Sequence, residues 1–156
     1  MGRVADRLAE LGIELPAVVT PVASYTPAVL DGDHVWVSGQ VPMVQGSLAR
    51  TGKLGDGEGF VTVEEGYELA RICALNGIAA AHSVLGDLDR VVRVVKVLGM
   101  VNSDPQFTGQ PQVINGASDV LGQVFGEAGV HARSAFGVAA LPLGAPVEVE
   151  MVLAVR

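Results

Sequence analysis

The sequence lacks the features that mark a secreted or membrane protein. It contains one cysteine, Cys73, so no disulfide can form within the chain, as is typical of a reducing cytoplasm. No apolar run approaches the roughly 18 residues that a membrane-spanning helix needs. The first residues are charged and lack the apolar core of a signal peptide. We therefore expect a cytoplasmic protein without a membrane partner.

Positive charge is also scarce. Ten Lys and Arg stand against seventeen Asp and Glu, which gives a formal net charge of −7 at pH 7. The densest basic group is only Arg90, Arg93 and Lys96. Nucleic-acid binding needs a concentrated basic footprint, so we expect no nucleic-acid partner. An anionic small molecule gains no long-range attraction from this charge, and any arginine that binds one must act locally.

The common catalytic and nucleotide-binding motifs are missing. The sequence has no G-x-x-x-x-G-K-[ST], no G-x-G-x-x-G after a strand, no H-E-x-x-H and no G-x-S-x-G. Its histidines, His34, His82 and His131, fall on different segments without metal-ligand spacing, so we expect no metal site. Cys73 lies within an apolar helical stretch without a nearby base, which favours a buried structural thiol over a nucleophile.

What the sequence does contain is the apolar patterning of one α+β domain that spans residues 1–156. Thr62 and Glu65 form a capping-box pattern at the start of a helix, and Gly86 follows its last apolar position. The predicted elements are a helix at 3–12 within an N-terminal extension at 1–16, an extended arm at 18–22, strands at 28–30 and 34–38, a helix at 62–85, a strand at 91–98, a helix at 113–128 that stops at Gly129, and a closing hairpin at 131–142 and 146–156.

This order predicts two helices packed on one face of a mixed sheet. The strand at 91–98 is apolar on both faces, which is typical of a central strand. Surface loops are expected at 43–60, which is rich in glycine, and at 102–112.

The closing hairpin carries the most informative polar residues. Arg133 opens its first strand, and Glu148 and Glu150 lie two apart on the second, so both carboxylates leave the same face of the sheet. An arginine in an apolar strand needs a partner for its charge. Two interpretations follow: Arg133 forms a structural ion pair with these carboxylates, or it binds an anionic group bidentately.

Several motifs along the chain resemble those of one protein family. They occur in the family's order within residues 20–156: Ser24-Tyr25-Thr26-Pro27-Ala28-Val29, Val37-Ser38-Gly39-Gln40-Val41-Pro42, Asn115, Arg133-Ser134, Leu141-Pro142 and Val147-Glu148-Val149-Glu150. These motifs are similar to those of the reactive-intermediate deaminases, the RidA or YjgF family. The resemblance implies a chorismate-mutase-like fold that assembles as a homotrimer, with ligand clefts between subunits.

The resemblance also implies roles for individual residues. Arg133 binds the carboxylate of a small 2-imino or enamino acid such as 2-aminoacrylate. Glu148 orients or activates the water that attacks the imine carbon, and it can transfer protons to the leaving ammonia. The residues expected to line the cleft are Tyr25 from the neighbouring subunit, Ser38, Gly39, Asn115 and the backbone near Ala135. No metal or organic cofactor is implied, because imine hydrolysis is already facile.

The chain departs from the family pattern in ways that indicate a divergent branch. Ala23-Ser24 replaces the usual Gly-Pro before the cleft tyrosine, Ala135 replaces a frequent cysteine, and the extension and two loops are longer. Two hypotheses follow: a cofactor-independent deaminase, or a non-catalytic protein that binds or senses a small carboxylate in the same cleft. Retention of Glu148 favours the enzyme, because binding alone requires only Arg133. Ribonuclease activity, described for some relatives, is disfavoured by the acidic charge.

Overall fold

The computed structural model describes residues 2–18 and 23–156 of the chain. The arm predicted at 18–22 lies outside these residues except for Val18, which belongs to no strand. The elements are α1 (Arg3–Glu10), β1 (Ala28–Asp31), β2 (His34–Gln40), β3 (Met43–Val44), β4 (Ser47–Leu48), α2 (Val63–Leu85), η1 (Leu88–Arg90), β5 (Val91–Asn102), α3 (Gln110–Phe125), η2 (Gly126–Gly129), β6 (Ala132–Val138), η3 (Pro142–Gly144) and β7 (Val147–Val155).

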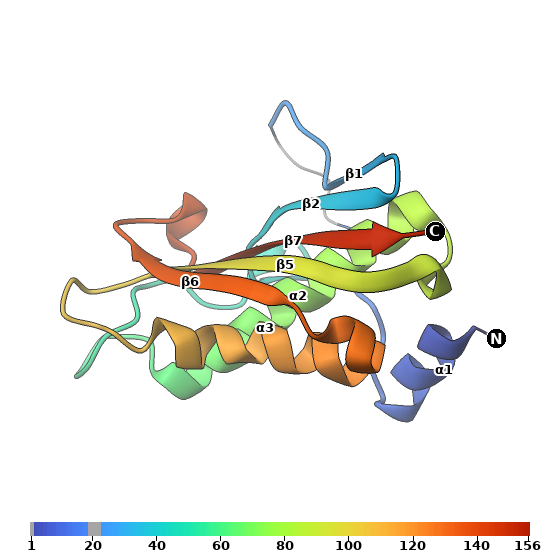
Figure 1. The fold of residues 1–156 in the computed structure, drawn as a ribbon. Helices are drawn as coiled ribbons and strands as arrows, with labels where there is room; N and C mark the ends of the chain where they lie inside the picture. The colour runs from blue at the N-terminus through green and yellow to red at the C-terminus, as the bar shows by residue number, and fades with distance from the viewer. Residues whose placement is uncertain (1, 19–22) are drawn as a thin grey trace.

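These elements form a sheet layer and a helix layer (Figure 1). Five strands pair in the order β1-β2-β7-β5-β6, and α2 and α3 pack beside each other against one face of this sheet. β5 and β6 run parallel, whereas the other neighbouring pairs are antiparallel, so the sheet is mixed. The predicted α+β class and the two sheet-packed helices are therefore confirmed. None of the helices in the described part of the chain is long and apolar enough to cross a membrane.

The closing hairpin predicted at 131–142 and 146–156 is wrong. β6 and β7 are both present, but β5 lies between them and pairs with each. The chain after β6 therefore crosses the end of β5 before β7 begins. Asn102 holds this crossing, because its backbone N–H donates to Pro146 O at 2.8 Å and its side chain donates to Ala145 O at 3.2 Å. Strands adjacent in sequence usually pair, but here β5 occupies the position between β6 and β7.

Both long helices begin and end for local reasons. The predicted capping box at α2 is confirmed: Thr62 Oγ1 accepts from the Glu65 N–H, and the Glu65 carboxylate accepts from the Thr62 N–H. Gly86, with a φ of 72°, ends α2 as predicted. The end predicted for the second helix, at Gly129, is too late. Gly126 has a φ of 61° and interrupts the helix, and only a 3-10 turn continues.

α3 and β5 extend further toward each other than predicted. α3 begins at Gln110, because Pro111 fits the first turn of a helix, where its missing N–H costs no hydrogen bond. β5 continues to Asn102. The loop predicted at 102–112 is therefore shortened to residues 103–109.

The segment 43–60 is only partly the surface loop that was predicted. It contains the small hairpin formed by β3 and β4. Leu54 is fully buried and forms a bridge with Val61. The side chain of Asn76 on α2 donates to Met43 O at the start of this segment at 3.1 Å and to Val41 O just before it at 3.2 Å. A single buried leucine makes no periodic pattern, so the glycine-rich composition concealed this packing.

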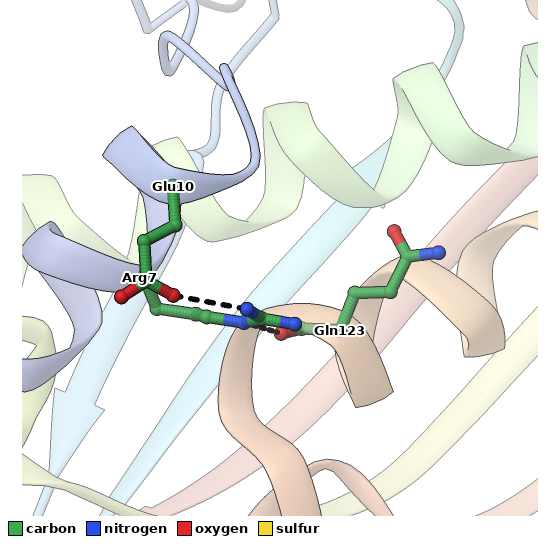
Figure 2. Close-up of polar contacts among 3 residues, drawn as sticks. All are labelled: Arg7, Glu10 and Gln123. Atoms are coloured by element: carbon green, nitrogen blue, oxygen red, sulfur yellow. Dashed lines mark hydrogen bonds and ion pairs between the residues drawn. The ribbon is translucent and has the colours of Figure 1, made fainter.

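The extension at 1–16 contains α1, which forms hydrogen bonds with two other parts of the domain. Its first N–H groups, including that of Val4, donate to the Asp89 carboxylate at 2.7 and 2.8 Å. The hydrogen bond from Val4 is the main reason that the pKa of Asp89 is lowered. Arg7 pairs with Glu10 and donates from Nε to Gln123 O near the C-terminal end of α3 (Figure 2). α1 is thus an integral part of the domain.

The sheet face that turns away from α2 and α3 is open. Trp36 and Phe136 are 54% and 43% exposed on it, and Val29 is exposed opposite Trp36. The central strand β5 is apolar on both faces, as predicted, and Val92 and Val95 remain exposed. Exposed apolar side chains that gather on one face are typical of interaction surfaces.

Gly116 sets the distance between α2 and α3. A Cβ at this position would overlap the backbone carbonyl of Tyr67 on α2, and backbone cannot swing aside as a side chain can. We expect Gly116→Ala to lower the free energy of unfolding by about 2 kcal/mol, measured by urea denaturation. Gly122→Ala is the matched control on the same helix, because nothing lies within 4 Å of its position. Equal midpoints for the two variants would contradict this packing.

Candidate active site

Arg133 lies on β6 with its side chain against α3. Its Nη1 donates to Asn115 Oδ1 at 2.9 Å and to Ser118 Oγ at 3.1 Å, and its Nη2 donates to Pro111 O at 3.3 Å. The three acceptors lie on one stripe of the helix, at positions i, i+4 and i+7. The predicted cleft residue Asn115 is therefore a direct partner of Arg133.

These contacts leave one edge of the Arg133 guanidinium free. They use three of its five N–H donors. The two that remain, on Nε and Nη2, have no acceptor among the described residues. Nε and Nη2 share an edge of the planar group, and two N–H donors on one edge match the two oxygens of a carboxylate. The three acceptors, which anchor the guanidinium, carry no charge. The Arg133 side chain is therefore held in place while its positive charge has no negative partner in these contacts.

The structural ion pair that the sequence allowed between Arg133 and the β7 carboxylates does not form. Arg133 aligns with Val97 of β5, and Glu148 aligns with Met100 from the other side. Strand spacing then puts the two Cα atoms roughly 14 Å apart. The side chains also leave opposite faces, since Arg133 contacts α3 whereas Glu148 lies between two buried valines of β7. Anion binding by Arg133 is the interpretation that fits this arrangement.

Glu148 lies against β2, where the register shifts between Val37 and Gln40. A side chain at Gly39 would overlap the Glu148 carboxylate, so the glycine permits this close approach. Burial raises the pKa of the Glu148 carboxyl, and the negative charge of Glu150 raises it further. A carboxyl group with a raised pKa exchanges protons closer to neutral pH, as general acid–base catalysis requires.

Ser38 links this region to the segment that carries Tyr25. Its Oγ donates to Thr26 O at 2.6 Å, and its N–H donates to Pro27 O at 2.9 Å. Tyr25 is 57% exposed, so its ring is accessible to a ligand or to another subunit. Tyr25, Ser38 and Gly39 thus belong to the same part of the molecule as Glu148.

Ala135 leaves the same face of β6 as Arg133 and packs partly against the core. The predicted site residues therefore fall into two groups within one chain. The Arg133 group consists of Arg133, Asn115 and Ala135, and the Glu148 group consists of Glu148, Gly39, Ser38 and Tyr25.

Sequence reasoning missed Ser118 and the carbonyl of Pro111, although both lie on the helical stripe of Asn115. It also interpreted His131 as an ordinary residue, whereas its ring Nε2 lies 2.9 Å from Ser118 Oγ. The spacing of residues 111, 115 and 118 was the available signal. No three His, Cys, Asp or Glu side chains within residues 2–18 and 23–156 are placed to hold a metal ion.

Cys73 is buried, as predicted. Its Sγ donates to Val147 O at 3.7 Å. Burial raises the pKa of the thiol well above its usual range, and the Glu148 charge acts in the same direction. Burial thus disfavours the thiolate that a nucleophilic cysteine needs.

The sequence of the chain matches a known family pattern. The pattern described as "YjgF/chorismate_mutase-like, putative endoribonuclease" matches residues 5–154. The chain belongs to the YjgF/chorismate-mutase-like family. The match begins at residue 5, within α1, so most of this helix falls inside the YjgF-family pattern.

Relatives of this YjgF-family chain span nearly its whole length. Protein TCP17 of Trypanosoma cruzi is 51% identical over 150 residues, which cover 96% of this chain and 92% of that protein. The crystal structure of Atu1372 from Agrobacterium tumefaciens, of unknown function, is 40% identical with a TM-score of 0.88, covering 98% and 92% of the two chains. A "putative endoribonuclease" from Shewanella oneidensis is 33% identical with a TM-score of 0.92, covering 99% and 100%.

Proposed function

We propose that this YjgF-family protein hydrolyses small 2-imino or enamino acids to 2-keto acids and ammonia without a cofactor. The observation that carries the proposal is the free edge of Arg133, which three neutral anchors hold in place. A planar carboxylate fits the two remaining N–H donors. A 2-imino acid held by its carboxylate has its reactive carbon fixed directly beside this anchor, ready for attack by water.

Glu148 moves the protons in this reaction. Water adds to the carbon of the C=N bond while Glu148 accepts one of its protons. The carboxyl group then returns that proton to nitrogen, which gives an amino alcohol. Glu148 next carries the hydroxyl proton of this intermediate to the same nitrogen, and the C–N bond breaks as the C=O bond forms and ammonia leaves. The raised pKa of Glu148 suits both transfers. An enamino acid enters the same sequence after its carbon gains a proton and its nitrogen loses one, which gives the imine.

The cleft lies between two copies of the chain. Within one chain, Arg133 and Glu148 leave opposite faces of the sheet at a Cα separation of roughly 14 Å, too far for one small acid to contact both. The open sheet face, with Trp36 and Phe136 exposed, supplies an apolar surface for assembly. In a ring, the Glu148 group of one copy can meet the Arg133 group of the next. The family resemblance favours a homotrimer.

RNA cleavage has less physical support, although the family description includes that activity. The net charge of −7 repels phosphate. The groove between α1 and the end of α3 carries equal numbers of both charges. Its charged lining consists of Arg3, Arg7 and Arg93 with Asp6, Glu10 and Glu127.

The proposed function is tested with 2-aminoacrylate and other 2-imino acids generated in situ, with detection of the keto acid formed. Acceleration over the uncatalysed rate supports the deaminase. Binding of pyruvate at Arg133 without acceleration of any imine would instead support a carboxylate-binding or sensing protein. Absence of both would contradict a carboxylate site at Arg133.

A further inference from the structure

A chain of hydrogen bonds runs from Arg133 to the backbone of η2. Arg133 Nη1 lies 3.1 Å from Ser118 Oγ, and Ser118 Oγ lies 2.9 Å from His131 Nε2. His131 Nδ1 lies 2.6 Å from the carbonyl oxygen of Gly129. The motifs of the family resemblance include neither Ser118 nor His131.

When the His131 imidazole carries a single ring proton, the two ends of this chain fix the direction of every hydrogen bond in it. The Gly129 carbonyl can only accept, so His131 Nδ1 carries a proton and donates it. The Arg133 guanidinium can only donate, so the Ser118 oxygen accepts from it. The remaining Ser118 proton then points to His131 Nε2, which accepts it in a neutral imidazole. One arrangement of protons satisfies all four groups.

We infer that Ser118 and His131 are positioning residues that orient Arg133 for the carboxylate of the substrate, an inference that rests on the proposed function. Both act on the Nη1 side of the guanidinium, away from the free edge formed by Nε and Nη2. They therefore turn and hold the group without contacting the substrate. Asn115 holds Nη1 as well, but it is exposed, whereas Ser118 and His131 are partly buried.

The chain can be tested independently of activity by nitrogen NMR of the imidazole rings at mildly alkaline pH. His131→Phe assigns the His131 signals by their loss, and His82→Phe is the control for an exposed histidine on α2. We expect His131 to carry its proton on Nδ1, with Nε2 unprotonated. A proton on Nε2 would overturn the inference, because Ser118 could then not donate to His131 while Arg133 donates to Ser118.

The positioning role is tested by calorimetry with pyruvate and by imine hydrolysis. Ser118→Ala and His131→Phe should raise the Kd for pyruvate and KM about tenfold, with kcat changed less than about twofold. Ser118→Thr keeps the hydroxyl and should behave like wild type. Ser83→Ala, which removes a hydroxyl bonded to Ala80 O on α2, is the matched control.

The outcomes separate two failures. If the wild type is active and binds pyruvate, but Ser118→Ala and His131→Phe match it, the positioning inference fails and the proposed function stands. If the wild type neither binds pyruvate nor hydrolyses imines, the proposed function fails and the inference fails with it. A loss that Ser118→Thr shares fully with Ser118→Ala would also overturn the role of the hydroxyl.

Discussion

Glu148→Gln is expected to lower kcat for imine hydrolysis about 10³-fold, while the Kd for pyruvate stays within a factor of about two. Gln retains the shape of the side chain and can still bind water, but it cannot accept a proton and return it. Arg133, which binds the carboxylate, is unchanged in this variant. Keto acid release at saturating substrate gives kcat, and calorimetry gives Kd.

Glu150→Gln is the matched control for this experiment. Glu150 leaves the same face of β7 two residues later and is exposed. Its replacement removes the same charge without removing the proposed proton carrier, so kcat should remain within about threefold of wild type. Equal losses in both variants would mean that charge, and not proton transfer by Glu148, accounts for the effect.

Glu148→Gln should also stabilise the fold near neutral pH. Burial and the Glu150 charge raise the pKa of Glu148 in the folded state above its ordinary value of 4.5, so the folded state holds this proton more tightly than the unfolded chain. Wild-type stability therefore decreases as the pH rises from the unfolded pKa through the folded pKa. Glu148→Gln does not lose stability in this way. Its melting temperature should therefore exceed that of wild type only at pH values above the unfolded pKa of Glu148. A melting temperature that exceeds that of wild type by the same amount in acid would contradict the raised pKa of Glu148.

Arg133→Ala is expected to raise the Kd for pyruvate and KM by about 100-fold, because the carboxylate loses its bidentate partner. Arg133→Lys should fall between this variant and wild type, since lysine keeps the charge but not the paired donors. The fold should persist in both. The anchors on α3 are neutral, and Asn115 and Pro111 are exposed, so water can replace the lost hydrogen bonds.

Calorimetry with pyruvamide separates charge recognition from general binding in the Arg133 variants. This uncharged analogue should bind wild type weakly, and Arg133→Ala should not weaken it further. Circular dichroism shows whether the variants remain folded. Unfolding of Arg133→Ala would mean that Arg133 is structural, and unchanged pyruvate binding by a folded variant would place the carboxylate site elsewhere.

Local signals in the sequence predicted local structure well. Thr62 and Glu65 specify the start of α2 by their own hydrogen bonds, and Gly86 ends it through its left-handed φ. The pairing of β6 with β5 could not be predicted in this way. It depends on which strand edges meet, and the apolar pattern of a strand is the same whichever neighbour it has.

The family resemblance named the site residues one by one, and their roles stay predictions, but it did not indicate that they divide between two faces of the sheet. The family resemblance indicated Arg133, Asn115 and Glu148, and the structure brings the first two together. Arg133 and Glu148 align with residues three apart on β5, so their side chains leave opposite faces, and the predicted hairpin excluded this intervening strand. The sequence did not predict the roles of Ser118 and His131, because these roles depend on hydrogen bonds that form only in the folded chain.

The central claim, a site shared between copies of the chain, is tested most directly by mixing two impaired variants at a substrate concentration well below the KM of Arg133→Ala. Arg133→Ala and Glu148→Gln are unfolded together, refolded as mixed oligomers and assayed for imine hydrolysis, after light scattering has confirmed three times the 16.1 kDa chain mass. In a randomly mixed ring, about one quarter of the clefts receive an intact Arg133 from one copy and an intact Glu148 from the next. We therefore predict recovery of about one quarter of wild-type activity. Mixed oligomers that remain as inactive as either variant alone would contradict the shared site.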